Sequence, residues 1–135
     1  MKIDERALLE AAYSASKNAY APYSGFSVGA ALLSENGRVF TGCNVENASY
    51  GATNCAERTA FFKAVSEGER DFAASAVVGL KKGERMQVCP PCGVCRQVMA
   101  ELCKKDFLVL LSDGERIVRY SLEELLPHSF NADSM

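Results

Sequence analysis

The sequence predicts an α/β domain of three layers, in which helices cover both faces of a central mixed sheet of about five strands. Segments with apolar residues at helical spacing alternate along the chain with short apolar segments that are bounded by turn residues. The length of 135 residues is that of one domain rather than two, and 48% hydrophobic residues are enough for a core. We therefore expect residues 1–135 to form a single domain.

The first half of the chain is predicted to form a helix, a β-hairpin and a long loop. Asp4 can cap a helix whose apolar face contains Leu8, Ala11, Ala12, Ala15 and Ala19. Asn36-Gly37 is typical of a tight hairpin turn between two strands. A helix-breaking segment, an apolar strand, its return strand and an irregular loop are expected in that order at residues 21–25, 26–33, 38–44 and 45–54.

The second half predicts two longer helices, three strands and a short final helix. Gly68 is expected to end the first of these helices, and Asp113-Gly114 to join the last two strands. Ser121-Leu122-Glu123-Glu124 has the sequence of a capping box for a final helix that ends at Pro127. The other helices and strands are expected in the order helix, strand, helix, strand, strand at residues 55–67, 73–80, 92–104, 107–111 and 116–120.

Charge and hydropathy exclude several classes of partner. Fifteen Lys and Arg residues against seventeen Asp and Glu give a formal charge of −2, without a basic run that could follow a phosphate backbone. This disfavours nucleic acid and favours a small, near-neutral ligand. The longest near-continuous apolar run, residues 72–80, is too short to cross a membrane. Residues 1–10 are charged where a signal peptide is apolar, so we expect a cytoplasmic protein whose six cysteines mostly stay reduced.

Three of the cysteines lie in two segments that predict a metal site. Cys55 begins one predicted helix, and Cys92 and Cys95 lie in the first turn of another. The two residues between Cys92 and Cys95 put both sulfurs on one side of that turn, within reach of one ion, and Cys55 would supply a third thiolate. Helix N-termini stabilise thiolates, so two such ends that face each other suit this cluster. Three protein ligands leave one position of a tetrahedral zinc ion open, which is typical of catalytic zinc.

Two charged residues follow Cys55 in its predicted helix. Glu57 does not share the helical face of Cys55, so we expect it to flank the metal and to move protons between water and substrate. Three thiolates on a divalent ion leave a net negative charge, which opposes ionisation of a bound water. Arg58 lies on the same helical side as Cys55 and is expected to donate to the thiolates, which would offset this charge.

Cys55-Ala56-Glu57 and Pro91-Cys92-Gly93-Val94-Cys95 together resemble the H-x-E and P-C-x-x-C signature of zinc-dependent nucleoside and nucleotide deaminases, with cysteine in place of histidine. This form is similar to that of the small homotetrameric cytidine deaminases. The likeness covers nearly the whole chain through further segments: Ala21-Pro22-Tyr23-Ser24, Val28-Gly29-Ala30-Ala31, Gly42-Cys43-Asn44-Val45-Glu46-Asn47, Cys95-Arg96-Gln97 and Glu124-Leu125-Leu126-Pro127 followed by Phe130. One departure is Pro90, where the family usually has serine.

The resemblance implies a hydrolase of pyrimidine salvage with the cytidine deaminase fold. It would deaminate cytidine, and 2′-deoxycytidine, to the uridine product and ammonia by attack of a zinc-activated water at C4. One zinc ion per subunit would be held by Cys55, Cys92 and Cys95, and Glu57 would be the catalytic proton shuttle. The resemblance also implies a homotetramer with shared active sites. It assigns substrate binding to Phe26 against the pyrimidine ring, Asn44 and Glu46 at the ribose hydroxyls, Tyr50 and Phe130 from neighbouring subunits, and Ala56.

The residues alone leave other functions open. Cys89 could be a fourth ligand and close a structural zinc site, which would make the chain a non-enzymatic zinc module. Cys92-Gly93-Val94-Cys95 at a helix start is also similar to a thioredoxin-type redox pair. The same metal chemistry would serve a deaminase of a modified aminonucleoside such as blasticidin S, whereas the short chain without a basic groove disfavours polynucleotide editing.

Overall fold

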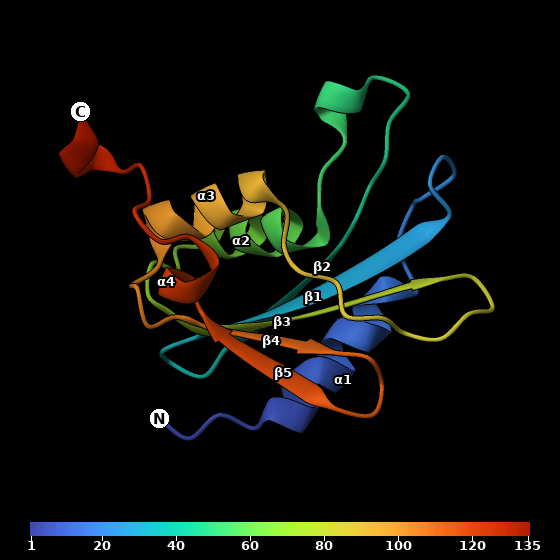
Figure 1. Ribbon diagram of the computed structural model, residues 1–135, viewed down its shortest axis with the longest axis horizontal. Helices are drawn as coiled ribbons and strands as arrows, with labels where there is room; N and C mark the ends of the chain where they lie inside the picture. Colours follow the sequence, from blue (N-terminus) through green and yellow to red (C-terminus); the bar gives the residue numbers. More distant parts are fainter.

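The computed structural model describes all 135 residues and contains a five-stranded mixed sheet with helices on both faces (Figure 1). The strand order is β2-β1-β3-β4-β5, in which β3 and β4 are parallel and every other neighbouring pair is antiparallel. The strands are β1 (Phe26–Ser34), β2 (Val39–Cys43), β3 (Phe72–Lys81), β4 (Leu108–Ser112) and β5 (Ile117–Ser121). The predicted three-layer α/β/α fold class is confirmed.

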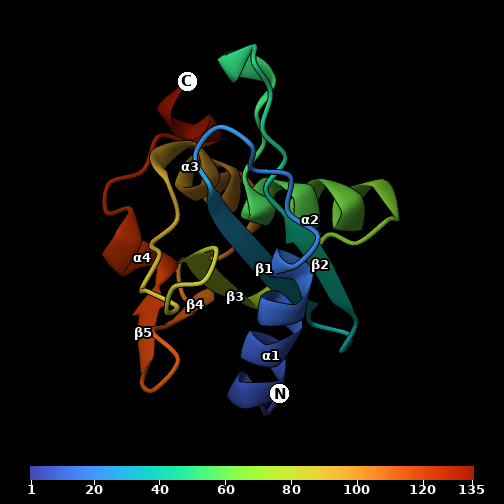
Figure 2. The same ribbon diagram turned by 90° about the vertical axis from the view of Figure 1, so that its right-hand side faces the viewer.

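The helices are divided unequally between the two faces of the sheet (Figures 1 and 2). Helix α1 (Glu5–Ser16) covers one face, whereas α2 (Ala56–Ser66) and α3 (Gly93–Leu102) lie side by side on the other. The short α4 (Leu122–Leu125) follows β5 and contacts α3. Two 3-10 turns, η1 and η2, cover Tyr50–Ala52 and Ala132–Ser134. None of these helices combines the length and the hydropathy that a membrane crossing requires.

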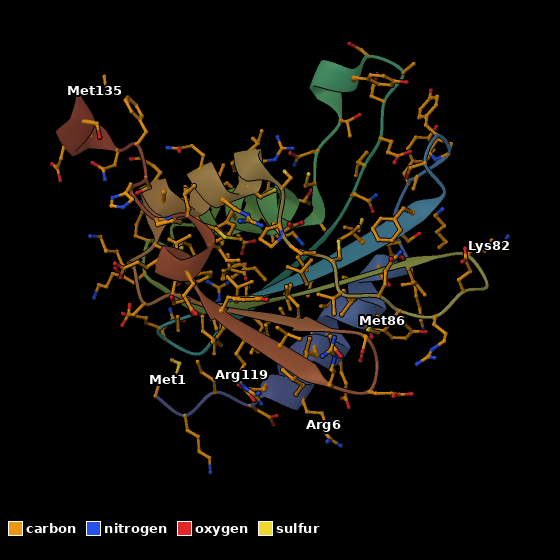
Figure 3. The ribbon with its side chains drawn as sticks, in the orientation of Figure 1. Met1, Arg6, Lys82, Met86, Arg119 and Met135 are labelled. Carbon is orange, nitrogen blue, oxygen red and sulfur yellow. The ribbon has the colours of Figure 1, made fainter.

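The strand pattern sends alternate side chains to the two faces, as the period of two in a β-strand requires. On β1, Val28, Ala30 and Leu32 belong to the core under α2 and α3, whereas Ala31 belongs to the core under α1. At the surface, Arg119 of β5 (labelled in Figure 3) pairs with Glu5 at the start of α1. The two N–H···O distances are 2.7 and 2.6 Å. The hairpin turn at Asn36-Gly37 and the capping box of Ser121 and Glu124 form as predicted.

The first helix is shorter than predicted, and its buried face differs from the predicted one. It ends at Ser16 instead of reaching Ala19, because the backbone of Tyr20 pairs with the segment after β2. The Tyr20 nitrogen donates to the Asn44 carbonyl oxygen over 3.0 Å, and the Glu46 nitrogen donates to the Tyr20 carbonyl oxygen over 2.8 Å. The buried residues are Leu8, Leu9, Ala12 and Ser16. A Cβ added at Gly29 would lie 1.9 Å from the Ala12 carbonyl oxygen and 2.5 Å from the Ser16 nitrogen. The helix backbone therefore rests directly on β1, and this contact decides which residues are buried.

Candidate active site and metal centre

Two helix N-termini bring three cysteine sulfurs together. Cys55 is the N-cap residue of α2 and Cys92 that of α3, and neither side chain caps its own helix. The Sγ atoms of Cys55, Cys92 and Cys95 all lie within 4.8 Å of one another, and those of Cys55 and Cys92 are 3.6 Å apart. Zinc–sulfur bonds of about 2.3 Å at tetrahedral angles place two sulfurs about 3.8 Å apart. The donor set and its spacing therefore fit a zinc ion.

Close packing of α2 against the sheet fixes the position of Cys55. A Cβ added at Gly42 of β2 would lie 2.5 Å from the Ala56 carbonyl oxygen and 2.6 Å from the Ala60 nitrogen. Ala56 and Ala60 are themselves almost completely buried. Because glycine faces small residues here, the first turn of α2 reaches the sheet backbone, and the N-cap residue Cys55 is held with it.

Arg58 lies where the sequence predicts, next to the sulfurs. Its Nη2 atom donates to the Cys55 sulfur over 3.2 Å. Hydrogen bonding with Cys95, opposed by burial and assisted by the Arg58 guanidinium, lowers the pKa of Cys55 to about 5. A cation in direct contact with a thiolate stabilises its charged form. The contact has the geometry that the predicted charge compensation requires.

Glu57 is buried although it carries a carboxyl group. Only 5% of the residue is exposed, at the first turn of α2 beside the cysteine cluster. Burial, reinforced by the nearby charge of Cys55, raises the pKa of Glu57 to about 7. A carboxyl group with this pKa can accept and return a proton near neutral pH. Glu57 is therefore not an ordinary exposed residue of a first helical turn.

The closed four-cysteine site is not formed. Cys89 lies outside the group of sulfurs that can share one ion, and all six cysteines are free thiols. Burial raises the pKa of Cys89 to about 11, and that of Cys103 to about 12. Both residues therefore behave as neutral, partly buried thiols, whereas the three clustered sulfurs have the arrangement of metal ligands.

Phe26 and Asn44 lie together at the start of β1. The Asn44 Oδ1 atom accepts from the Val28 nitrogen and its Nδ2 atom donates to the Phe26 carbonyl oxygen, both over 2.8 Å. A Cβ on Gly79 of β3 would lie 2.6 Å from the Phe26 ring, so the ring rests on bare backbone. Asn44 therefore fixes the strand that carries Phe26, a structural use that leaves part of the amide's hydrogen-bonding capacity free.

Glu46 is held by the turn that follows Pro22. Its Oε1 atom accepts from the backbone nitrogens of Tyr23 and Ser24 over 2.9 and 3.1 Å, and its Oε2 atom accepts from the Ser24 hydroxyl. These bonds, the Ser24 hydroxyl first, lower the pKa of Glu46. The carboxylate lines a hollow of about 370 Å³ that Tyr50 also lines. Sequence reasoning missed the role of Ser24, although a hydroxyl beside Pro22-Tyr23 and Gly25 is a common turn signal.

Tyr50 and Phe130 are not brought to the cysteine cluster within one chain. They are 82% and 61% exposed. Tyr50 lies on η1, on a loop that stands away from the sheet, and Phe130 lies in the segment that leads to the C-terminal η2 (Figure 1). Within one chain, Tyr50 therefore shares a hollow with Glu46, but neither aromatic residue belongs to the cysteine cluster.

Comparison with known proteins agrees with this site. The family model of the cytidine and deoxycytidylate deaminase zinc-binding region matches residues 1–111. The chain belongs to this family. The cytidine deaminase of Halalkalibacterium halodurans is 53% identical over 134 residues, with 98% of each chain covered. The structure of cytidine deaminase from Burkholderia pseudomallei has a TM-score of 0.86 and 52% identity, and covers 95% of this chain and 100% of its own.

A more distant relative represents the second predicted substrate class. Blasticidin-S deaminase of Bacillus cereus is 30% identical over 104 residues, with 74% of each chain covered. Membership of the deaminase family confirms that the chain is a zinc-dependent hydrolase. The predicted cofactor is confirmed as well, because a zinc-binding family and a cluster of three sulfurs fit one zinc ion per subunit.

Proposed function

We propose that this protein catalyses the hydrolytic deamination of cytidine and 2′-deoxycytidine to the uridine product and ammonia, with residues 1–135 acting as one deaminase domain. One observation carries the proposal: the sulfurs of Cys55, Cys92 and Cys95 converge beside the buried carboxyl of Glu57. Relatives named cytidine deaminase that match nearly the full chain, at 53% and 47% identity, support cytidine over other aminonucleosides.

Cys55, Cys92 and Cys95 would hold the zinc ion, which supplies Lewis acidity that makes water nucleophilic near neutral pH. Glu57 takes a proton from the attacking water and gives it to N3 of the pyrimidine ring, so that C4 accepts the water oxygen. Glu57 then takes the remaining proton from the new hydroxyl group and gives it to the amine at C4. The bond from C4 to the amine breaks, ammonia leaves, and the C4 carbonyl forms with N3 still protonated.

The sugar and base are assigned to the residues around β1. The Phe26 ring, fixed against Gly79, packs on the pyrimidine. The Glu46 carboxylate, already oriented by Ser24, accepts hydrogen bonds from the ribose hydroxyls. The side-chain amide of Asn44 uses its remaining hydrogen-bonding capacity to bind the same hydroxyls. Ala56, buried at the start of α2, is assigned to substrate binding as well. This pocket selects nucleosides over free bases, because buried polar groups are left unpaired when the sugar is missing.

The active sites are shared in a homotetramer. Support comes from the exposure of Tyr50 and Phe130, since large aromatic side chains are enriched at subunit interfaces. Phe62 of α2 and Val94 of α3 are exposed as well, on the face that carries the cysteines. In this assembly Phe130 covers the base and Tyr50 reaches the ribose end of a neighbouring subunit's site. A cytoplasmic location stays a prediction.

The deciding experiment measures bound zinc and ammonia release with cytidine, 2′-deoxycytidine, cytosine and blasticidin S in parallel. We expect one zinc ion per subunit and turnover of both nucleosides. Free cytosine should have a kcat/KM lower by about 10- to 100-fold or more, since each unpaired group costs about 1–3 kcal/mol. Equal kcat/KM for cytosine and cytidine would overturn the ribose assignments, and blasticidin S as the best substrate would overturn the proposed substrate.

A further inference from the structure

The segment that delivers Cys92 to the metal site has almost no hydrogen bonds of its own. Pro90 and Pro91 have no backbone N–H, so this segment has few donors. No residue from 88 to 91 takes part in a backbone–backbone hydrogen bond. The segment makes a single hydrogen bond, in which the Nε atom of Arg96 donates to the Pro91 carbonyl oxygen over 2.8 Å. Apart from the packing of its buried ring, Pro91, the residue that precedes Cys92, is therefore held by one guanidinium.

The same guanidinium also holds the C-terminal part of the chain. Its Nη1 atom donates over 2.7 Å to the carbonyl oxygen of Leu125, the last residue of α4. Helix ends leave such carbonyls without partners, and a cation there is favourable. Arg96 makes no ion pair with an acidic residue, so its hydrogen bonds go to these two carbonyls.

Gln97, the next residue of α3, makes a second connection to this part of the chain. Its Nε2 atom donates to the Phe130 carbonyl oxygen over 2.8 Å. The segment 125–130 is thus fixed to α3 at two points, which are the two residues that follow Cys95 in the sequence. Phe130 is held at its backbone although its side chain is exposed.

We propose that Arg96 is a positioning residue that couples the turn carrying Cys92 to the C-terminal segment 125–130. The planar guanidinium of Arg96 donates to both the Pro91 and the Leu125 carbonyl oxygens. A displacement of Cys92 on metal loss therefore weakens the hydrogen bond to Leu125, and a displacement of Leu125 weakens the hydrogen bond to Pro91. Lysine cannot replace it, because a single ammonium on a flexible stem does not present two fixed, divergent donors. The assignment of Phe130 to substrate rests on the proposed function, but the coupling does not.

The test uses the zinc-loaded protein and the variants Arg96→Lys and Gln97→Ala. Zinc release to a chelator is followed by a coloured zinc indicator, and chymotrypsin cleavage after Phe130 is followed by mass spectrometry. Because Phe130 is assigned to a neighbouring subunit's site, size-exclusion chromatography checks that all samples compared have the same subunit assembly. Arg96→Lys should release zinc about 10-fold faster, the lower end of the effect of losing an outer partner of a metal site. Gln97→Ala should speed cleavage after Phe130 several-fold and leave zinc release at the wild-type rate.

The coupling itself is read from the effect of zinc on cleavage. In the wild type, zinc removal should speed cleavage after Phe130, whereas in Arg96→Lys cleavage should be fast with or without zinc. Arg85→Lys, at an exposed pair with Glu115, is the matched control and should change neither rate. Hydrogen exchange of β1 and β3 checks that each variant is folded, and Arg96→Lys is chosen because it keeps the charge and most of the length of the side chain.

Three results would overturn the inference: wild-type zinc release in Arg96→Lys, wild-type cleavage that does not respond to zinc, or zinc release in Gln97→Ala as fast as in Arg96→Lys. Ammonia release from cytidine is measured on the same samples. A wild-type protein that binds zinc but releases no ammonia would overturn the proposed function alone, because the zinc and cleavage readouts do not depend on turnover.

Discussion

On one face of the sheet α1 lies against Gly29, and on the other α2 lies against Gly42. In both places a Cβ would come within 2.5 Å of a helix carbonyl oxygen, that of Ala12 or that of Ala56. The consequences differ because α1 carries none of the predicted site residues, whereas α2 begins at the metal-binding cysteine. The same kind of contact therefore supports only the fold on one face, and the fold together with the metal site on the other.

The hydrophobic cores on the two faces of the sheet also differ, because only one of them borders the site. The core under α1 is built from alanine, leucine and valine side chains and contains no aromatic ring. The core under α2 and α3 contains the large rings of Phe61, Phe72 and Phe107, and has Phe26 and Cys89 packed at its edge, where the site lies. A site formed by two helix ends needs a core that fixes both helices, so changes on this face should affect metal binding as well as stability.

The largest effect should come from Glu57→Gln, which keeps the shape of the side chain but removes its ability to carry protons. Loss of one general acid–base group lowers kcat by on the order of 10²–10⁴, and Glu57 serves more than one transfer, so we expect a loss at or above this range. Zinc content should stay at the wild-type level. Glu67→Gln, at the other end of α2, is the control, and substantial turnover by Glu57→Gln would contradict the assignment.

The comparison of the two faces can be tested directly with Gly29→Ala and Gly42→Ala. Each should lower the free energy of unfolding by about 1–3 kcal/mol or more, because the new methyl group meets helix backbone. Only Gly42→Ala should also speed zinc release, since it moves the first turn of α2. Urea denaturation and a chelator assay measure the two quantities, and equal zinc release by both variants would remove the distinction between the faces.

Arg58→Ala should have an intermediate effect that is confined to the metal site. The variant loses the 3.2 Å contact with the Cys55 sulfur, so we expect zinc affinity to fall by about 10- to 100-fold while the protein stays folded. Competition with a chelator measures the affinity, and circular dichroism monitors the fold. Arg70→Ala is a control at an exposed arginine, and an Arg58→Ala protein with unchanged zinc affinity and turnover would exclude Arg58 from this role.

The smallest effect concerns acid stability at the β4–β5 turn, which lies apart from the metal site. Backbone N–H groups of Arg116 and Glu115 lower the pKa of Asp113 to about 2. A lowered folded-state pKa gives stability that is present above the ordinary pKa of 3.8 and is lost as the pH falls through about 2. Asp113→Asn should therefore lose less stability than the wild type between pH 5 and pH 2.5. Identical losses in urea denaturation would contradict this.

The sequence predicts those features whose signals are local. Helix starts, turn residues and the spacing of Cys92 and Cys95 lie within a few residues, so strands, helices and the cofactor could be predicted. The predicted end of α1 was wrong because the actual end depends on pairing of Tyr20 with the segment after β2. The bonds from Asn44 to β1 and from Arg96 to Leu125 depend on register and on packing between distant segments, which no local pattern encodes. The roles assigned to individual site residues stay predictions.

The central claim is that three sulfurs hold the zinc ion and leave its fourth coordination position to an oxygen or nitrogen atom. X-ray absorption spectroscopy at the zinc edge of the purified protein measures this directly. We predict three sulfur neighbours at about 2.3 Å together with one oxygen or nitrogen neighbour. A shell of four sulfurs, with Cys89 as the additional ligand, would make the site structural and contradict the account.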